Sequence, residues 1–337
     1  MWPLGPSLSS QLPSIFVNIW LKNKPKDKCA THTCLHKDSM ETITLSSEVT
    51  VSRIIQGFWR LHSWNWTPQE LHDFMVQAIE LGVTTFDTAE IYGNYTAETQ
   101  LGEVLKLDPS LRSKIQIITK TGINKLHPDR PYTFKHYETS YDKIIFSCNE
   151  SLKKLNTSHI DVYLIHREDP FFDHHEADRA FKQLKAEGKI KTYGVCNYDP
   201  VKFSAFHKVS NQALVTNQIE VSPLEFEHFN SGMMDLLQAE KVHPMFWSPL
   251  AGGSIFTSEE PSIVALRTVL TRIASTHHVD LDTIVYAWLL MHPVKGLVIS
   301  GSQKISRLKN AIAGLSIKLS LEEWYEIYLA SGQQVLR

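Results

Sequence analysis

Short apolar runs alternate with amphipathic segments eight times between Ile54 and residue 314, and this alternation limits the fold more than any other feature. The apolar runs are rich in β-branched residues and are followed by polar or glycine residues, as strands are. They are Ile54–Phe58, Thr84–Asp87, Ile115–Thr119, Asp161–Ile165, Thr192–Cys196, Leu214–Glu220, Pro244–Ser248 and Leu297–Ile299. Helical patterns lie at 68–81, 96–106, 139–155, 176–187, 200–208, 231–240, 262–291 and 304–314. Because parallel strands need helical crossovers, eight such units predict an α/β fold, a single closed (β/α)8 barrel.

An open, doubly wound sheet is the alternative architecture. A dinucleotide-binding sheet of that kind begins with a glycine fingerprint between its first strand and first helix. The segment 58–67, which joins those two elements here, contains no glycine. The sequence therefore favours the closed barrel, whose active site is built at the C-terminal ends of the strands.

We expect one barrel domain over residues 41–337, preceded by an irregular, disordered N-terminal extension over residues 1–40. Hydrophobic residues make up 42% of the 337, enough for one large core. The apolar stretch 14–21 is too short for a membrane helix, and it lacks the basic lead-in and cleavage site of a secretory signal. Four cysteines are too few for a disulfide framework, so we expect a reducing, cytoplasmic location. The cationic flank 22–28 leaves organelle targeting as the alternative.

The charge balance bears on the partners. A formal net charge of −2 gives no global field that would gather nucleic acid or an anionic membrane. We therefore expect a small-molecule partner, with no nucleic acid and no membrane. The oligomeric state stays open, and a monomer is allowed.

Unusual polar side chains fall where the predicted strands end. In chain order they are Asp87, Lys120, His166, Asn197 and Gln218, and Trp247 lies in the seventh strand. The strand ends of a barrel converge on one face. These side chains are therefore predicted to line a common site.

Seven motifs in this order resemble the aldo-keto reductase superfamily over residues 52 to 330. They are FDTAEIYG (86–93), ITKTG (118–122), LIHRED (164–169), GKIKTYGVCNY (188–198), NQIE (217–220), WSPLAGG (247–253) and GSQKISRLKN (301–310). With GFWR at 57–60, the chain looks closest to a bacterial-type subgroup of predicted oxidoreductases.

The resemblance implies an NADPH-dependent oxidoreductase that reduces aldehydes or ketones to alcohols. Its proton donor would be Tyr92, supported by Asp87, Lys120 and His166. A free tyrosine titrates near pH ~10, so we expect a neighbouring cation, Lys120, to lower the pKa of Tyr92. Asp87 would keep Lys120 charged, and His166 would donate a hydrogen bond to the carbonyl oxygen.

The resemblance also assigns residues to NADPH/NADP+. Asn197 and Gln218 would hold the nicotinamide carboxamide, because amide side chains both donate and accept. Trp247 would stack on the nicotinamide ring, although core packing is the alternative for such a residue. In the loop that follows, Ser248, Leu250 and Gly252 would lie against the pyrophosphate. Cys196 stands where a serine is common, which removes one good hydrogen bond to the carboxamide.

The last motif opens a helix, and a helix N-terminus favours phosphate. Ser302 and Arg307 match positions that bind the adenosine 2′-phosphate, and this favours NADPH over NADH. Gly301 stands where many relatives carry a lysine, a role that Lys304 could take. Asn310 closes the same cofactor-binding motif.

Aromatic residues in the predicted loops suggest an apolar substrate pocket. We expect Trp59, Trp64 and Phe171 to form its wall, with Trp66 and Phe172 nearby. Such a wall suits hydrophobic or aromatic carbonyl substrates. For any single ring, packing within the core or between loops is nearly as good an explanation.

Other functions are weaker alternatives. A metal site could use His166, Asp173, His174 and His175, or Cys29, His32, Cys34 and His36. His174 and His175 open a predicted helix, and the spacing of the second set matches no familiar zinc site, so we expect no metal. An NADPH-binding, redox-sensing auxiliary protein that regulates a partner is the second functional hypothesis. A metal-dependent barrel hydrolase ranks last.

Overall fold

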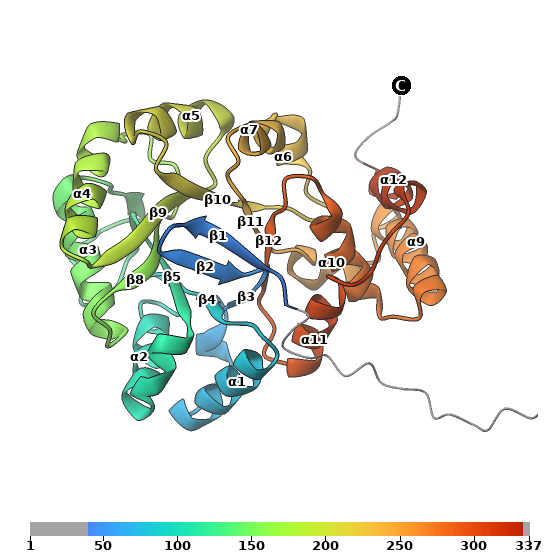
Figure 1. Ribbon diagram of the computed structural model, residues 1–337, viewed down its shortest axis with the longest axis horizontal. Helices are drawn as coiled ribbons and strands as arrows, with labels where there is room; N and C mark the ends of the chain where they lie inside the picture. Colours follow the sequence, from blue (N-terminus) through green and yellow to red (C-terminus); the bar gives the residue numbers. More distant parts are fainter. Residues whose placement is uncertain (1–39, 333–337) are drawn as a thin grey trace, which may run out of the picture. The chain divides into compact units, whose positions relative to one another are not determined.

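The computed structural model describes residues 40–332, which form a closed barrel of eight parallel strands (Figure 1). Around the barrel the strands follow the order β10-β11-β12-β3-β4-β5-β8-β9. They are β3 (Ile54–Gly57), β4 (Thr85–Asp87), β5 (Gln116–Thr121), β8 (Ile160–Ile165), β9 (Ile190–Cys196), β10 (Leu214–Glu220), β11 (Met245–Trp247) and β12 (Leu297–Ser300). The predicted (β/α)8 barrel is confirmed. The expectations for residues 1–39, including the cysteine and histidine cluster, lie outside the described residues.

Helices form the outer ring and begin where the local sequence provides caps. The main ones are α1 (Pro68–Glu80), α2 (Ala97–Leu107), α3 (Tyr141–Lys154), α4 (His174–Ala186), α5 (Pro200–Val209), α7 (Met233–Ala239), α9 (Pro261–His277), α10 (Leu281–Met291), α11 (Ile305–Ala313) and α12 (Leu321–Ala330). Thr67 and Glu70 form a capping box at the start of α1. The Asp173 carboxylate accepts hydrogen bonds from the first backbone N–H groups of α4, so α4 begins at His174.

The prediction of one helix over 262–291 is wrong, because two helices, α9 and α10, occupy this stretch. The break is at His278, whose φ of 56° is left-handed and ends the helical hydrogen-bond ladder. Asp280 then occupies the N-cap position of α10. Helix α12 was not predicted from the sequence; its Trp324 ring stacks on Trp288 of α10 at 5.2 Å.

An antiparallel hairpin, β1 (Thr42–Ser46) and β2 (Val49–Ser52), lies across one opening of the barrel (Figure 1). Val49 and Val51 are buried against side chains from inside the barrel, including Ile55 and Ile118. The hairpin therefore closes the N-terminal end of the barrel. The sequence reasoning did not predict these two strands.

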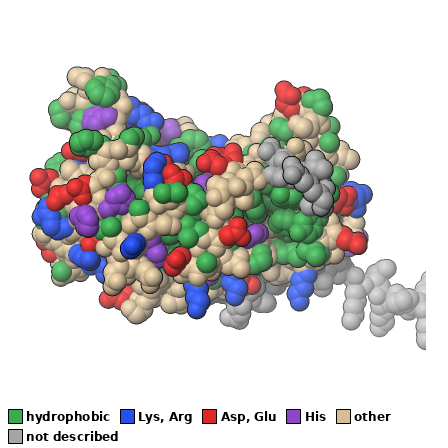
Figure 2. Space-filling model, turned by 90° about the horizontal axis from the view of Figure 1, so that it is seen from above, with side chains coloured by type: hydrophobic (Ala, Val, Ile, Leu, Met, Phe, Trp, Pro, Cys, Tyr) green, Lys and Arg blue, Asp and Glu red, His purple; other side chains and the backbone are tan. Residues whose placement is uncertain are grey.

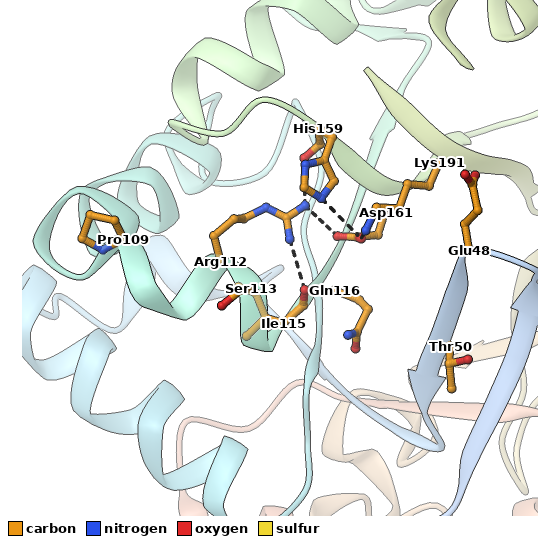
Figure 3. A pocket seen from close by; sticks show the side chains of 10 residues that line it. All are labelled: Glu48, Thr50, Pro109, Arg112, Ser113, Ile115, Gln116, His159, Asp161 and Lys191. Atoms are coloured by element: carbon orange, nitrogen blue, oxygen red, sulfur yellow. Dashed lines mark hydrogen bonds and ion pairs between the residues drawn. The ribbon is translucent and has the colours of Figure 1, made fainter. Parts of the chain in front are cut away.

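A polar cavity of about 370 Å³ lies beside this closed end (Figure 3). Its centre is the Asp161 carboxylate, which is nearly fully buried at the start of β8. Arg112 Nη2 and Lys191 Nζ each lie 2.8 Å from that carboxylate. These bonds tie β8 to the loop before β5 and to β9. Because they lie at the N-terminal end of the strands, we assign them to stability.

Charged side chains of both signs are interspersed with apolar ones on the face of the molecule in Figure 2. This mixed face agrees with the small net charge of −2. Among the described helices, none combines the length and the apolar character needed to cross a bilayer.

Candidate active site

The barrel brings Tyr92, Asp87 and Lys120 together at its C-terminal end. Lys120 Nζ lies 2.7 Å from Asp87 Oδ1, 2.8 Å from the Thr88 carbonyl oxygen and 3.2 Å from the Tyr92 hydroxyl oxygen. An ammonium group has three N–H donors, and here each has an acceptor. The Tyr92 oxygen therefore accepts a bond from Lys120, which leaves its own proton free to be donated elsewhere.

Neighbouring strands fix this arrangement. Asp87 is the last residue of β4 and pairs with Ile118 of β5, two residues before Lys120. Tyr92 lies in the turn after β4, and its N–H donates to the Ala89 carbonyl oxygen. The pairing of β4 with β5 therefore brings Lys120 next to Asp87 and Tyr92.

Glu90 was not identified from the sequence, yet it anchors the turn that carries Tyr92. Its buried carboxylate accepts a hydrogen bond from Thr121 Oγ1 at 3.2 Å and faces Lys143 Nζ at 3.5 Å. Its backbone N–H donates to the Lys120 carbonyl oxygen at 3.1 Å. The available signal was an acidic residue between the Asp87 and Tyr92 of the FDTAEIYG motif.

His166 completes the group directly after β8. Its ring meets the Tyr92 ring edge-on, with centroids 5.5 Å apart, and its backbone N–H donates to the Thr121 carbonyl oxygen. Burial, together with the charges of Lys120 and Arg167, holds the pKa of His166 well below its ordinary value. The ring is therefore neutral near pH 7 and retains one N–H that can donate to a substrate oxygen.

The expectation that Lys120 brings the pKa of Tyr92 below the ordinary tyrosine value is wrong. Burial raises the pKa of Tyr92 to about 12, and the charge of Lys120 only partly opposes this effect. Burial is the largest single influence on Lys120 and by itself would lower its pKa. The charge of Asp87, the hydrogen bond to it and smaller effects of Tyr92 and Cys196 together outweigh burial, so the pKa lies above the ordinary value. At neutral pH the site holds a protonated tyrosine beside a charged lysine.

The three residues expected near the nicotinamide lie beside this group. Asn197 Nδ2 donates to the His166 carbonyl oxygen at 3.2 Å, and Asn197 Oδ1 accepts from Trp247 Nε1 at 3.0 Å. Gln218 Nε2 donates to Asp87 Oδ2 at 2.8 Å. The thiol of Cys196 is buried here, and burial raises its pKa to about 12, so it is neutral.

The loop after β11 follows a tight, partly left-handed backbone path. Ser248, Ala251, Gly252 and Gly253 all have positive φ angles. The Ala251 N–H donates to the Ser248 carbonyl oxygen, and the Gly253 N–H donates to the Leu250 carbonyl oxygen. The glycines leave room for a pyrophosphate to approach the backbone, since a Cβ at Gly253 would meet no atom within 4 Å.

Arg60, from the GFWR motif, contacts this loop and was also missed. Its Nη2 donates to the Gly252 carbonyl oxygen at 3.4 Å, and its guanidinium lies over the Trp59 ring. The arginine thus brings a positive charge to the loop from the segment after β3, which is separated from β11 only by β12.

The start of α11 holds the residues expected at the 2′-phosphate. Arg307 is paired with the buried Asp282 at 2.9 Å, while its side chain stays 45% exposed. Asn310 Nδ2 donates to Asp280 and Asp282, each at 2.9 Å. The N-cap residue Lys304 makes no side-chain cap, so the first N–H groups of α11 are available to an anion.

Gly301 and Ser302, which precede α11, complete this end of the site. Ser302 Oγ accepts from the Lys304 N–H at 3.2 Å. A Cβ at Gly301 would meet nothing within 4 Å, so the backbone there is open. Amide side chains, an open glycine backbone and a half-exposed guanidinium together suit the chemistry of a dinucleotide with a 2′-phosphate.

The three aromatic residues expected in the pocket wall occupy different surroundings. Trp59 is 61% exposed and Phe171 is 95% exposed. The Trp64 ring instead packs against the core rings of Phe58 and Phe74. Trp59 and Phe171 therefore remain as rings that a substrate can reach, while Trp64 joins its loop to α1.

The metal site considered from the sequence is not formed by the described residues. Within residues 40–332, no group of three or more His, Cys, Asp or Glu side chains is arranged to hold a metal ion. Asp173, one of the candidate ligands, caps α4 with its carboxylate.

Comparisons with known proteins agree on one family. The Aldo/keto reductase family model matches residues 53–329. An oxidoreductase of Bacillus subtilis, YcsN, is 40% identical over 86% of this chain and 98% of its own length. A 6-dehydroglucose reductase of Agrobacterium fabrum is 39% identical over 88% of this chain and its full length.

A solved structure gives the same fold. The crystal structure of the thermostable aldo-keto reductase Tm1743, in complex with the inhibitor epalrestat, superposes with a TM-score of 0.73. It covers 86% of this chain and all of the other, at 24% sequence identity.

Proposed function

This chain belongs to the aldo/keto reductase family, and on that premise we propose that it reduces aldehydes and ketones to alcohols with NADPH. One observation carries the proposal. Lys120 donates to Asp87, Thr88 and Tyr92 at once, so the cation that contacts Tyr92 is itself held by an anion. This arrangement suits a tyrosine that gives up its proton and is then left as a phenolate.

The protonation states favour reduction. A carbonyl oxygen gains negative charge as hydride arrives, and it needs a proton and hydrogen-bond donors at that moment. With a pKa of about 12, Tyr92 keeps its proton at neutral pH and can donate it. Lys120 then stabilises the phenolate that remains. The neutral His166 ring donates a hydrogen bond to the carbonyl oxygen of the substrate and orients the substrate.

The cofactor, when bound, supplies the hydride from its nicotinamide ring. Asn197 and Gln218 would hold its carboxamide, and Trp247 would stack on its ring. Arg307 supports NADPH over NADH, because a guanidinium can fork onto phosphate oxygens and Asp282 keeps this one in place. Ser302 and the open N-terminus of α11 would add neutral donors to the same phosphate.

Substrate choice is proposed from the mouth of the barrel and from the relatives. Trp59 and Phe171 offer exposed rings that suit substrates with an apolar or aromatic face. The faces of sugar rings also pack on such side chains, and one relative is a 6-dehydroglucose reductase. Aldehydes derived from sugars therefore belong beside aromatic aldehydes among the candidates.

The test is NADPH consumption over a panel of aromatic, aliphatic and sugar-derived aldehydes and ketones. We expect turnover that falls by about 10²–10⁴-fold in Tyr92→Phe, because general acid catalysis contributes on that order. Tight NADPH binding without turnover on any panel member would contradict the proposal and would favour the auxiliary, partner-regulating role.

A further inference from the structure

The Asp87 carboxylate makes two hydrogen bonds, one from each of its oxygens. Oδ1 accepts from Lys120 Nζ at 2.7 Å, and Oδ2 accepts from Gln218 Nε2 at 2.8 Å. All three side chains are buried, with at most 3% of their residues' surface exposed. The second bond joins the proton-donating group to a residue expected to hold the cofactor.

Strand pairing fixes Gln218 in this position. It lies in β10 opposite Cys196 of β9 on one side and Met245 of β11 on the other. Its Nε2 also lies 3.8 Å from the Met245 sulfur, so both N–H groups face protein atoms. Among the described residues, the structure records no hydrogen-bond partner for Gln218 Oε1. The amine end of this amide thus binds Asp87, and its carbonyl end is left to accept from a carboxamide N–H.

We propose that Gln218 is a positioning residue of the proton donor, because its bond to Asp87 fixes the carboxylate that holds Lys120 against Tyr92. The inference rests on the proposed function for its setting and extends it to a residue that does not touch Tyr92. The terminal torsion of an aspartate is broad, so a single bond to Lys120 leaves its plane free to rotate. The second bond fixes the plane and spreads part of the negative charge onto Gln218.

The groups that face Tyr92 determine the direction of the effect. They are Lys120 from β5, Asp87 from β4, the neutral Cys196 thiol from β9 and the neutral His166 ring after β8. Lys120 lowers the pKa of Tyr92, whereas the negative charge of Asp87 raises it. Removing the Gln218 donor exposes more of the Asp87 charge, so Tyr92 should become harder to ionise.

The experiment uses Gln218→Met, which keeps the chain length and removes the donor. Ionisation of Tyr92 is followed in the cofactor-free protein through the Cζ resonance of ¹³C-labelled tyrosine, assigned by its loss in Tyr92→Phe. We expect the alkaline change of this resonance to begin at a pH about 0.5–1 unit higher than in wild type, since one hydrogen bond is worth that much. Gln218→Glu, which adds a second carboxylate, should shift it further in the same direction.

Asn197→Ala is the matched control, because Asn197 is also expected at the carboxamide but does not bond to Asp87. It should raise the KM for NADPH and leave the Tyr92 resonance where it is in wild type. Identical titrations in Gln218→Met and wild type would overturn the inference, even if the enzyme reduces carbonyls. A shifted titration in a protein without turnover would leave the inference standing and contradict only the proposed reaction.

Discussion

At the scale of single residues, the site depends on how three donors and three acceptors are matched around Lys120. Its bonds to Asp87, the Thr88 carbonyl and Tyr92 use every ammonium N–H. Burial raises the pKa of Tyr92 to about 12, so at neutral pH the lysine does not ionise the tyrosine. In the proposed reaction Lys120 would stabilise the phenolate that forms when Tyr92 gives up its proton. The charge of Lys120 would therefore stabilise the transition state more than the substrate complex.

Lys120→Met should therefore be nearly as damaging as Tyr92→Phe. We expect kcat to fall by about 10²–10⁴-fold in both variants, while the Kd for NADPH from fluorescence titration changes little. Lys120→Arg would keep the charge in a different shape and serves as the comparison. Activity in Lys120→Met equal to that of wild type would rule out the proton-donor scheme.

Trp247 is proposed both to stack on the nicotinamide ring and to orient Asn197 through a hydrogen bond. Its indole N–H donates to Asn197 Oδ1, while Asn197 Nδ2 donates to the His166 carbonyl oxygen, so Trp247 helps to fix the orientation of the Asn197 amide. Trp247→Phe keeps a ring for stacking but removes this donor, so NADPH binding should weaken by about fivefold to tenfold. Trp247→Leu should weaken it further, and an unchanged Kd in the Phe variant would show that the ring alone matters.

At the scale of elements, helices α2 and α11 show two kinds of close approach. In α11, Arg307 and Asn310 both reach back to Asp282 at the start of α10. In α2, Gly102 lies so near α3 that a Cβ would come within 1.9 Å of the Lys154 carbonyl oxygen. The first contact holds Arg307 and Asn310 where the cofactor phosphate is proposed to bind, and the second allows two helices to pack closely.

Arg307→Met should convert the proposed NADPH preference into indifference. Loss of charge-assisted bonds to a phosphate is expected to raise the KM for NADPH by about 10–100-fold and to leave that for NADH unchanged. Lys309→Met, which removes an exposed cation from the same helix, is the control and should leave both KM values unchanged. Equal losses with both cofactors would mean that Arg307 does not read the 2′-phosphate.

Gly102→Ala should destabilise the barrel, because α2 and α3 would have to separate to admit the methyl group. We expect the free energy of unfolding in urea to fall by at least roughly 2 kcal/mol. Gly301→Ala is the matched change at a position where the Cβ meets nothing, and its stability should equal that of wild type. A stable Gly102→Ala protein would show that the two helices can shift at little cost.

At the scale of the whole molecule, the two ends of the barrel have separate tasks. The β1–β2 hairpin and the Asp161 cluster close the N-terminal end, whereas the ionisable residues of the site gather at the other. Core burial has a further consequence, because several histidines lie inside the fold. Burial lowers the pKa of His166, His207 and His228 below 6.5.

These three histidines should therefore make the fold less stable as the pH falls below about 6.5, an effect that the raised pKa of His72 opposes. Below that pH the unfolded chain binds protons on these three histidines and the folded chain does not, so acid favours unfolding. Above pH 6.5 both states are neutral at these positions and the contribution is flat. Urea midpoints between pH 5 and 8 should decline on the acid side, less steeply in His207→Gln. Midpoints that are constant from pH 8 to 5 would contradict this account.

The order of the eight barrel strands, and the positions of Asp87, Lys120 and His166 at strand ends, were determined by the sequence alone. Alternating periodicity records which face of each element is buried, and parallel strands bring their ends together. Local signals of this kind also fix where helices begin, as at Thr67 and Asp173. They missed the break at His278, since one left-handed residue leaves the apolar pattern continuous.

Only the tertiary structure decided which side chains are in contact and which ionisable groups are charged when buried. Gln218 and Asp87 are 131 residues apart and meet because the barrel closes. The pKa of Tyr92 rises rather than falls because desolvation depends on everything packed around the ring, and no motif encodes that quantity. Trp64 packs against the core ring of Phe58 because a loop residue packs wherever the neighbouring elements leave room, and its motif does not encode this.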